Sequence, residues 1–297
     1  MDIKSILEKR RVSVSFEIFP PKKQDGMESV QQAAAELVGL HPDFISITCG
    51  AGGSTQGNTA EITASVEKQD TAALAHLTCV RSTRTQLEDA IVSYKAMGVK
   101  NVLALRGDMP RDMQEGEDVF PSGLRHSSDL VPLLKEVGFC VGGACYPEGH
   151  PESRNRDADI DNLKYKVDAG VDFLTTQMFF DNDMLYSFLY RLQSAGIHVP
   201  VVAGIMPVTN AAQVSRMVDL SNAYVPRKLL SLCDKFRESK DAMWQAGIAY
   251  ATDQIIDLIS NGVRGIHIYT MNKPKVARAI MQNIDSIVSA TNGLMGA

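Results

Sequence analysis

An acidic residue, Glu17, stands near the end of the first apolar run of this chain and is the first candidate for chemistry. It lies in Phe16–Pro21, where it has aromatic residues on both sides. A carboxyl group among aromatic side chains is poorly solvated, which favours its protonated form and suits it to act as a general acid near neutral pH. The alternative is an ion pair at the end of a strand with Lys22 or Lys23.

Polar residues also end later apolar runs. The second run leads through Thr48 and Cys49 into a glycine-rich loop at residues 50–53, where the backbone can approach a ligand closely. This loop does not match the dinucleotide fingerprint and lacks the lysine of a phosphate loop. The fourth run ends in Arg106-Gly107-Asp108, which brings together a cation, a permissive glycine and an anion. An internal ion pair between Arg106 and Asp108 is the alternative to a binding role.

Three further runs carry isolated polar side chains. His76 lies within the third run, where a buried histidine without any ligand is the more ordinary interpretation. Tyr146 and His150 follow the fifth run in a turn that two prolines stiffen, so both side chains can be held in fixed directions. Gln177 follows the sixth run and offers a donor and an acceptor to the edge of a heterocycle.

A helical pattern after the fifth run places three polar residues on one face. Asp159, Asn162 and Lys166 stand at positions i, i+3 and i+7. A solvated helix face explains this spacing equally well. The pattern alone therefore does not establish a binding role.

The elements that position these residues alternate regularly between strands and helices. The runs predict strands at 12–19, 43–49, 72–80, 101–107, 139–146, 172–179, 199–206 and 265–270. Their content of Val, Ile, Leu and Phe, with little polar alternation, is typical of strands buried on both faces. Helices are expected at 27–40, 59–69, 84–97, 127–137, 158–169, 184–195, 210–220, 240–261 and 273–291. Eight such units in series predict an α/β fold, a (β/α)8 TIM barrel, as one domain over residues 1–297.

Glycines mark three of the expected helix ends. Gly98, Gly170 and Gly262 each stand directly before the valine that leads into the next strand. A glycine at this place favours a left-handed helix cap. Two loops, 108–125 and 147–157, are long and follow strand ends, on the side where barrels of this kind build their sites.

Composition excludes several classes of protein. The 297 residues include 30 basic and 35 acidic side chains, a formal charge of −5 that gives no general attraction to nucleic acid or anionic membranes. Cys140, Cys145 and His150 are five residues apart, but the tight spacing of a structural zinc site is missing, so no metal is expected. No apolar stretch reaches the roughly 18 residues of a membrane span, and the first residues lack a signal core. We expect a cytoplasmic protein with reduced thiols.

The chain resembles the 5,10-methylenetetrahydrofolate reductases, flavoproteins of one-carbon metabolism. Matching motifs occur in the order of that family and span nearly the whole chain. They are FEIFPP at 16–21, HLTC at 76–79, ALRGD at 104–108, YPEGHPE at 146–152, TQMFFD at 176–181, GIMPVTN at 204–210 and HIYTMNK at 267–273.

The resemblance implies a barrel that binds FAD without a dinucleotide-binding domain. In the family, NAD(P)H reduces the flavin and leaves, and methylenetetrahydrofolate then accepts the hydride in a ping-pong mechanism that supplies methyl groups for methionine synthesis. Carried onto this chain, Glu17 is the general acid that opens the five-membered ring of the folate. Asp108 lies near the flavin and the pterin, where it tunes the flavin potential and orients the folate.

The resemblance also assigns binding residues. The folate contacts are Gln177, Gln213 and Lys273, with Gln177 shared by the nicotinamide. Relative to the family, Cys49 and Met217 replace common aromatic residues and Lys273 replaces arginine, which loses bidentate recognition. The implied FAD contacts are Thr48, Cys49, Ala51, His76, Arg106, Gly107, Asp108, His126, Ser127, Tyr146, His150, Asp159, Asn162 and Lys166.

Two other functions remain open at this point. A non-redox methyltransferase barrel that depends on a pterin would bind folate without flavin. A reductase subunit could instead receive its electrons from a partner protein. The resemblance favours NADH over NADPH only by analogy, implies a homo-oligomer, and leads us to expect no regulatory domain after the barrel.

Overall fold

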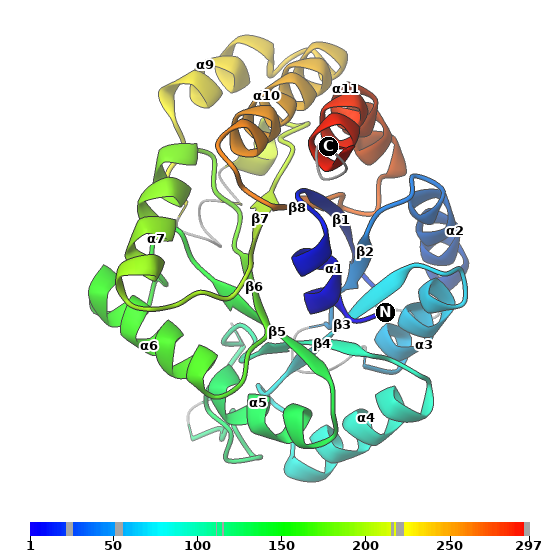
Figure 1. The fold of residues 1–297 in the computed structure, drawn as a ribbon, viewed down its shortest axis with the longest axis vertical. Helices are drawn as coiled ribbons and strands as arrows, with labels where there is room; N and C mark the ends of the chain where they lie inside the picture. The colour runs from blue at the N-terminus through cyan, green and yellow to red at the C-terminus, as the bar shows by residue number, and fades with distance from the viewer. Residues whose placement is uncertain are drawn as a thin grey trace.

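Eight parallel strands close into a barrel in the computed structural model, which describes residues 1–21, 26–50, 56–110, 112–114, 116–214, 217 and 223–293 (Figure 1). Each strand pairs with the next along the chain, and β8 pairs with β1 to complete the ring. This arrangement confirms the predicted (β/α)8 barrel. The strands are β1 (Ser13–Ile18), β2 (Phe44–Ile47), β3 (Ala72–Thr78), β4 (Asn101–Leu105), β5 (Cys140–Cys145), β6 (Phe173–Thr176), β7 (Val201–Ile205) and β8 (Gly265–Tyr269).

Helices surround the ring of strands. Most of the expected helices are confirmed, while α1 and α9 were not predicted and the expected helix at 210–220 falls partly outside the described residues. None of the helices in the described part of the chain is long and apolar enough to cross a membrane. The helices are α1 (Ile3–Lys9), α2 (Met27–Val38), α3 (Gln56–Glu67), α4 (Arg84–Ala96), α5 (Ser127–Glu136), α6 (Arg156–Asp168), α7 (Asn182–Ser194), α9 (Arg227–Phe236), α10 (Lys240–Ser260) and α11 (Pro274–Gly293).

The three predicted glycine caps are confirmed by the backbone. Gly98, Gly170 and Gly262 have φ angles of 82°, 119° and 83°. Side chains other than glycine adopt this left-handed region only with strain, because their Cβ crowds the backbone. These residues therefore end α4, α6 and α10 and turn the chain back toward the next strand.

The residues of β1 alternate between the two faces of the barrel wall. Val14, Phe16 and Ile18 belong to the large apolar cluster shared with the helices. Ser15 and Glu17, which lie between them in the sequence, are buried as well. The expectation of little polar alternation is therefore wrong for β1, because its inward face carries hydroxyl and carboxyl groups that hydrogen bonds and neighbouring imidazoles accommodate inside the barrel.

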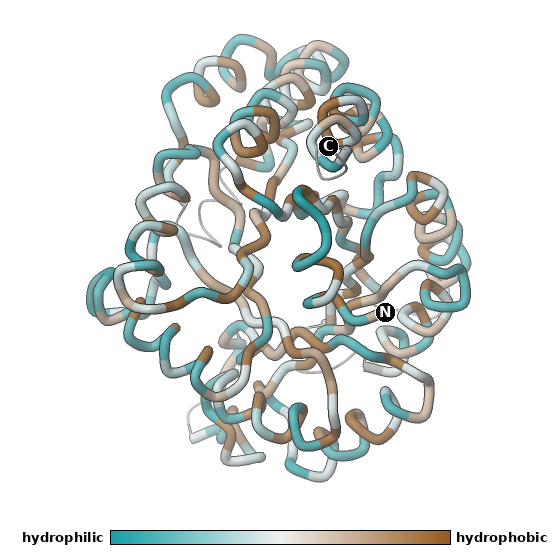
Figure 2. Tube along the Cα trace, viewed as in Figure 1, coloured by the Kyte–Doolittle hydropathy of each residue, from teal (hydrophilic) through white to brown (hydrophobic). Residues whose placement is uncertain are grey.

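A second apolar cluster fills the amino end of the barrel. Ile3, Ile6 and Leu7 of α1 pack there with inward residues of the strands such as Phe44 and Phe173. Figure 1 shows α1 lying across this end of the ring. Figure 2 shows hydrophilic residues on the outward turns of the surrounding helices. The amino end is thus closed by packing, while polar groups occupy the carboxyl end.

Candidate active site

Glu17 lies inside the barrel near the carboxyl end of β1 and is only 6% exposed. The register places it opposite Ser46 of β2 and Tyr269 of β8. Two imidazoles face its carboxyl group: His267 Nε2 lies 3.6 Å and His76 Nε2 lies 3.9 Å from Glu17 Oε2. Both are longer than hydrogen bonds. The expected alternative partners, Lys22 and Lys23, lie outside the described residues.

Each imidazole is paired with a buried serine. His76 Nε2 lies 2.6 Å from Ser46 Oγ, and His267 Nδ1 lies 2.8 Å from Ser15 Oγ. Burial lowers the pKa of His76 to about 4, although the charge of Glu17 acts in the opposite direction. His76 is therefore neutral near pH 7, because a proton on it would be poorly solvated. The two pairs surround Glu17 with rings whose orientation is fixed.

The end of β8 locks the end of β1. Asn272 Oδ1 accepts a hydrogen bond of 2.8 Å from Phe19 N, and Asn272 Nδ2 donates one of 2.8 Å to Phe19 O. Thr270 Oγ1 donates to the main-chain oxygen of Glu17 at 2.7 Å. Asn272 has a φ of 54°, which asparagine tolerates better than most residues. These bonds hold the main-chain carbonyl of Glu17 and the backbone of Phe19, two residues after it.

Arg106 and Asp108 do not form the ion pair that the sequence left open. Arg106 instead binds both carboxylate oxygens of Glu152 through Nη1 and Nη2, at 2.5 and 2.8 Å. Asp108 is exposed at the rim of the barrel. The proline-flanked turn after β5 brings Glu152 to this place, which makes the bidentate geometry possible. Asp108 is thus left to face solvent or a ligand.

Gly107 lies between these two residues in a conformation that only glycine adopts easily. Its φ is 89°, and a Cβ built on it would meet Val80 Cβ at 3.2 Å and Thr78 Cβ at 3.3 Å. The backbone here turns sharply beside the end of β3. The permissive glycine expected from the sequence is confirmed as a structural requirement, which is separate from any contact with a ligand.

Tyr146 and His150 lie together after β5. Their rings meet edge to face with centroids 4.6 Å apart. Burial raises the pKa of Tyr146 to about 12, and burial together with Arg106 lowers the pKa of His150. Both side chains are therefore neutral near pH 7. The structure therefore brings the two predicted side chains into contact, while the stiffening of their directions by the turn stays a prediction.

The three polar residues of α6 do not share one environment. Asp159 is 9% exposed and its Oδ1 accepts a hydrogen bond of 2.8 Å from Ser153 Oγ. Lys166 Nζ donates to Ala144 O at 2.7 Å, and burial lowers the pKa of this lysine. Asn162 is exposed. The interpretation of this spacing as a purely solvated helix face is therefore wrong for Asp159 and Lys166, which turn toward the end of β5.

The remaining predicted residues lie around the carboxyl rim. Gln177 N donates to Cys145 O at 2.7 Å, and Gln177 Oε1 accepts from Met178 N at 2.9 Å. Thr48 N donates to Ile18 O at 2.9 Å, which ties the end of β2 to β1. His126 and Ser127 begin α5, and Ser127 is 7% exposed.

Of the four remaining residues from the resemblance, three lie in the described part of the chain. Gln213 N donates a local hydrogen bond to Asn210 O, and Lys273 N donates one to Thr270 O. Cys49 is half-buried at the end of β2. Ala51 lies outside the described residues.

Sequence reasoning missed several groups around Glu17. Ser15, Ser46 and His267 are at most 1% exposed and lie within hydrogen-bond or ionic range of the site. Tyr269 OH donates to Thr176 O at 2.8 Å beside them. A usable signal was the alternation Ser13-Val14-Ser15-Phe16-Glu17, which sets three polar residues on one face of a strand.

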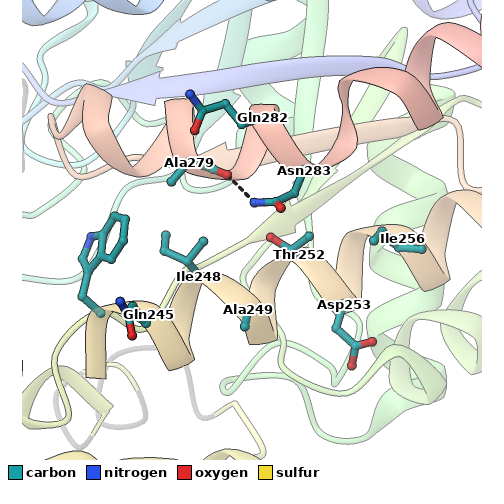
Figure 3. A pocket seen from close by; sticks show the side chains of 10 residues that line it. Gln245, Ile248, Ala249, Thr252, Asp253, Ile256, Ala279, Gln282 and Asn283 are labelled. Atoms are coloured by element: carbon teal, nitrogen blue, oxygen red, sulfur yellow. Dashed lines mark hydrogen bonds between the residues drawn. The ribbon is translucent and has the colours of Figure 1, made fainter. Parts of the chain in front are cut away.

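One cavity lies away from this site, in the groove between α10 and α11 on the outside of the barrel. It has a volume of about 570 Å³. Figure 3 shows Ile248 and Thr252 of α10 facing Ala279 and Asn283 of α11 across it. The groove holds no pair of titratable groups suited to proton transfer, so we place the chemistry at the barrel mouth instead.

Cysteines do not create a second candidate site. Burial raises the pKa of Cys140 to about 11, so this thiol stays protonated near pH 7. Over the described residues, no group of three or more His, Cys, Asp or Glu side chains could hold a metal ion.

Comparison with known proteins identifies the barrel. Residues 2–285 match the family model described as methylenetetrahydrofolate reductase. The chain belongs to the methylenetetrahydrofolate reductase family. It is 35% identical over 276 residues to 5,10-methylenetetrahydrofolate reductase of Pectobacterium carotovorum subsp. carotovorum, covering 92% of this chain and 90% of that relative. As a member of this reductase family, the chain is an oxidoreductase.

Two other similarities set the limits of this identification. The chain is 34% identical over 303 residues to methylenetetrahydrofolate reductase (NADH) 1 of Arabidopsis thaliana, covering 96% of this chain and 50% of the plant reductase. It also superposes with a TM-score of 0.64 on an uncharacterized protein from Clostridium thermocellum that binds two copies of 5-methyl-5,6,7,8-tetrahydrofolic acid. That structure is 14% identical and covers 98% of this chain and 100% of the other, so the likeness concerns the fold.

Proposed function

We propose that this chain catalyses the flavin-dependent reduction of 5,10-methylenetetrahydrofolate to 5-methyltetrahydrofolate, with NAD(P)H as the reductant and FAD as the cofactor. The observation that carries the proposal is Glu17, a buried carboxyl group at the mouth of a barrel whose sequence matches the reductase family over residues 2–285. Folate reduction needs an acid at such a place, because the closed ring of the substrate is a poor hydride acceptor until a nitrogen is protonated.

The residues at the barrel mouth fit a polar heterocyclic cofactor. Thr78 Oγ1, Thr175 Oγ1 and Glu148 Oε1 are buried without a hydrogen-bond partner, and all three lie at or just beyond the carboxyl ends of strands. Arg106 and Lys166 supply positive charge at the same rim. Buried polar groups need partners, and a flavin bound there would offer both donors and acceptors.

The proposed FAD contacts are the residues given by the resemblance. When bound, FAD would carry the hydride between the two substrates. Arg106 and Lys166 would meet the negative charge of its phosphates. The complete set is Thr48, Cys49, Ala51, His76, Arg106, Gly107, Asp108, His126, Ser127, Tyr146, His150, Asp159, Asn162 and Lys166.

Glu17 acts on the folate in this proposal. Its carboxyl group donates a proton to one nitrogen of the five-membered ring, and the bond between that nitrogen and the one-carbon unit breaks. The iminium ion that results is the hydride acceptor. Gln177, Gln213, Lys273 and Asp108 would bind the folate, with Asp108 at the rim in a position to orient the pterin. The polar wall around Glu17 keeps the acid apart from bulk water, which makes the transfer to the substrate more favourable.

Anaerobic reduction of the purified protein tests the proposal directly. The protein is expected to be yellow with the absorbance of bound flavin, to be bleached by NADH or NADPH, and to regain its colour when methylenetetrahydrofolate is added. A folded protein that cannot be reconstituted with FAD would contradict the cofactor assignment. Bleaching without reoxidation by folate would contradict the substrate assignment.

Three further points remain predictions. The preference for NADH or NADPH is tested by measuring which nicotinamide bleaches the flavin at the lower concentration. Light scattering of the purified protein tests the expected homo-oligomer. Fractionation of the producing cells tests the cytoplasmic location.

A further inference from the structure

Glu152 contacts two of the proposed FAD-binding residues at once, although it is not among the residues that the resemblance assigns. Its carboxylate accepts hydrogen bonds from Nη1 and Nη2 of Arg106 at 2.5 and 2.8 Å. Its main-chain N–H donates to Nδ1 of His150 at 3.1 Å. An arginine that directly follows β4 and an imidazole from the turn after β5 are therefore joined through one residue.

Two consecutive tight turns bring Glu152 to this place. In the first, Gly149 N donates to Tyr146 O at 3.0 Å. In the second, Ser153 N donates to His150 O at 2.9 Å. Gly149 has a φ of 92°, which residues with a Cβ adopt only with strain. The main chain itself therefore sets the position of Glu152, and the ion pair with Arg106 is built on that position.

Arg106 keeps donors for a ligand while Glu152 holds its plane. An arginine side chain has five N–H donors in one rigid plane. Nε of Arg106 donates to Gly107 O at 3.3 Å, and the contact with Glu152 uses one N–H on each of Nη1 and Nη2. Among the contacts of the described residues, this leaves one further N–H on each of these two nitrogens. A guanidinium already held in one orientation loses less freedom when it binds a ligand oxygen.

The contact with Glu152 also determines which nitrogen of His150 carries its proton. A main-chain N–H can only donate, so Nδ1 of His150 must be the acceptor. Burial and the charge of Arg106 lower the pKa of His150, so the ring is neutral near pH 7. Its proton is then on Nε2, which becomes an N–H donor of fixed identity. Arg106 and His150 thus both present N–H groups, and both suit a ligand rich in oxygen acceptors.

The charge of Glu152 acts against an anionic cofactor, so its presence needs a compensating benefit. Removal of this charge would favour FAD through long-range electrostatics, whereas loss of the contact would release Arg106. The side chain of Glu152 is 56% exposed and that of Arg106 is 22% exposed. Water and salt screen the repulsion from an exposed carboxylate, while the two hydrogen bonds to Arg106 are direct. Positioning of Arg106 should therefore outweigh the repulsion.

We propose that Glu152 is a positioning residue for the cofactor, which fixes the guanidinium plane of Arg106 with its carboxylate and the Nε2–H form of His150 with its main-chain N–H. The inference rests on the proposed function, in which Arg106 and His150 contact FAD. Glu152 itself exchanges no proton or electron with either substrate.

Glu152→Gln tests the inference, and Glu117→Gln is its matched control. Glu117 also accepts two hydrogen bonds from one arginine, at 2.8 and 3.3 Å from Nε and Nη2 of Arg81, but this pair includes no proposed FAD contact. Flavin fluorescence on dilution of the holoenzyme measures the dissociation constant of FAD. Glu152→Gln should raise this constant about tenfold, within the range of coupling in an ion-pair network, and Glu117→Gln should match the wild type. Tighter binding by Glu152→Gln, or equal weakening in both variants, would overturn the inference.

Arg106→Lys shows whether Glu152 acts through Arg106. Lysine keeps the positive charge but has no planar guanidinium for Glu152 to hold. When Arg106 is already lysine, the further change Glu152→Gln should alter the dissociation constant of FAD by about twofold or less. A tenfold effect of Glu152→Gln in both backgrounds would mean that Glu152 acts by a different route and would contradict the proposed positioning.

A spectroscopic measurement checks the second half of the inference. Long-range ¹H–¹⁵N correlation spectra of histidine-labelled holoenzyme should show His150, assigned through His150→Gln, protonated on Nε2 at pH 7. The same form should persist in Glu152→Gln, because the bond to Nδ1 comes from the main chain. A proton on Nδ1 or a charged ring would refute the role of the main-chain N–H.

The wild-type protein distinguishes failure of the inference from failure of the proposed function. If the folded wild-type protein binds no FAD, the cofactor assignment is wrong and the inference falls with it. If the wild type binds FAD and Glu152→Gln binds it equally tightly, the cofactor assignment stands and the positioning by Glu152 is wrong.

Discussion

Asn272 pairs through its side-chain amide with both main-chain groups of Phe19, two residues beyond Glu17. The same kind of bond occurs at the other end of β1, where Asn292 Oδ1 accepts from Val12 N at 3.0 Å and Asn292 Nδ2 donates to Val12 O at 2.9 Å. One strand is thus fixed at both ends by asparagine side chains. The difference between the two ends lies in their distance from the candidate acid.

Asn272→Ala should therefore damage both stability and catalysis. The loss of two hydrogen bonds to half-buried main-chain groups is expected to lower the free energy of unfolding by about 2 kcal/mol. Urea denaturation measures this effect. The rate of folate reduction should also fall, because the backbone beside Glu17 is released, while reduction of the flavin by the nicotinamide changes little.

Asn292→Ala provides the matched control for that substitution. It should lower the free energy of unfolding by a similar amount and leave the rate of folate reduction at the wild-type level. Equal kinetic effects of the two substitutions would show that Asn272 acts through general stability rather than through the site.

Glu17→Gln should separate the two half-reactions. Reduction of the flavin by NAD(P)H needs no proton from Glu17, whereas folate reduction should slow by about 100-fold or more, the usual contribution of a general acid. Anaerobic stopped-flow absorbance measures each half-reaction. Glu67→Gln, which changes a half-buried carboxyl group at the end of α3, should leave both rates unchanged. Wild-type rates for both half-reactions in Glu17→Gln would refute the assigned role.

Asp108→Asn should raise the reduction potential of the bound flavin. The exposed rim position leaves the Asp108 carboxylate available to the cofactor, and removal of a negative charge near the ring favours the reduced, more electron-rich form. A dye-coupled titration measures the potential. Asp118→Asn removes the same charge from an exposed position of the neighbouring loop and should have little effect. An equal change in both variants would place Asp108 away from the flavin.

His76 should make the protein less stable as the pH falls. Its pKa is lowered from 6.5 to about 4 in the folded protein, so the unfolded chain binds the proton first. The free energy of unfolding is therefore expected to decrease between pH 6.5 and 4, by on the order of 3 kcal/mol at most from this residue, with no further loss below that window.

Urea denaturation at several pH values tests that dependence. His76→Gln removes the titrating ring and should flatten the curve between pH 6.5 and 4. His198→Gln removes an exposed histidine and should leave the slope unchanged. Parallel curves for the two variants would mean that His76 is not the residue responsible.

Much of the fold could be predicted from the sequence, because buried strands and glycine caps leave local signals. The apolar runs located all eight strands, and Gly170 ended its helix where expected. Two helices, α1 and α9, were not predicted, and the reason is clear for α1. The α1 helix has seven residues, too few for a clear period, and its apolar residues Ile3, Ile6 and Leu7 are stabilised by packing inside the barrel.

The site was predictable only in part, since its contacts join residues that are far apart in the sequence. Glu17 was found because an acid among aromatic residues is unusual. The pairing of Arg106 with Glu152 depends on how the turn after β5 folds back, which spacing does not reveal. The facing of His267 and Ser15 depends on how β8 closes against β1, a register set by the whole ring of strands.

The packing of α1 across the amino end has a consequence for how substrates enter the barrel and how product leaves it. Because Ile3, Ile6 and Leu7 pack into that end, the amino end of the barrel is closed. A ligand would therefore approach Glu17 from the carboxyl end. An electron donor and a folate would both have to enter through the carboxyl end of the barrel. Excess of either molecule should therefore obstruct the other, and product must depart along the route by which the substrate arrived.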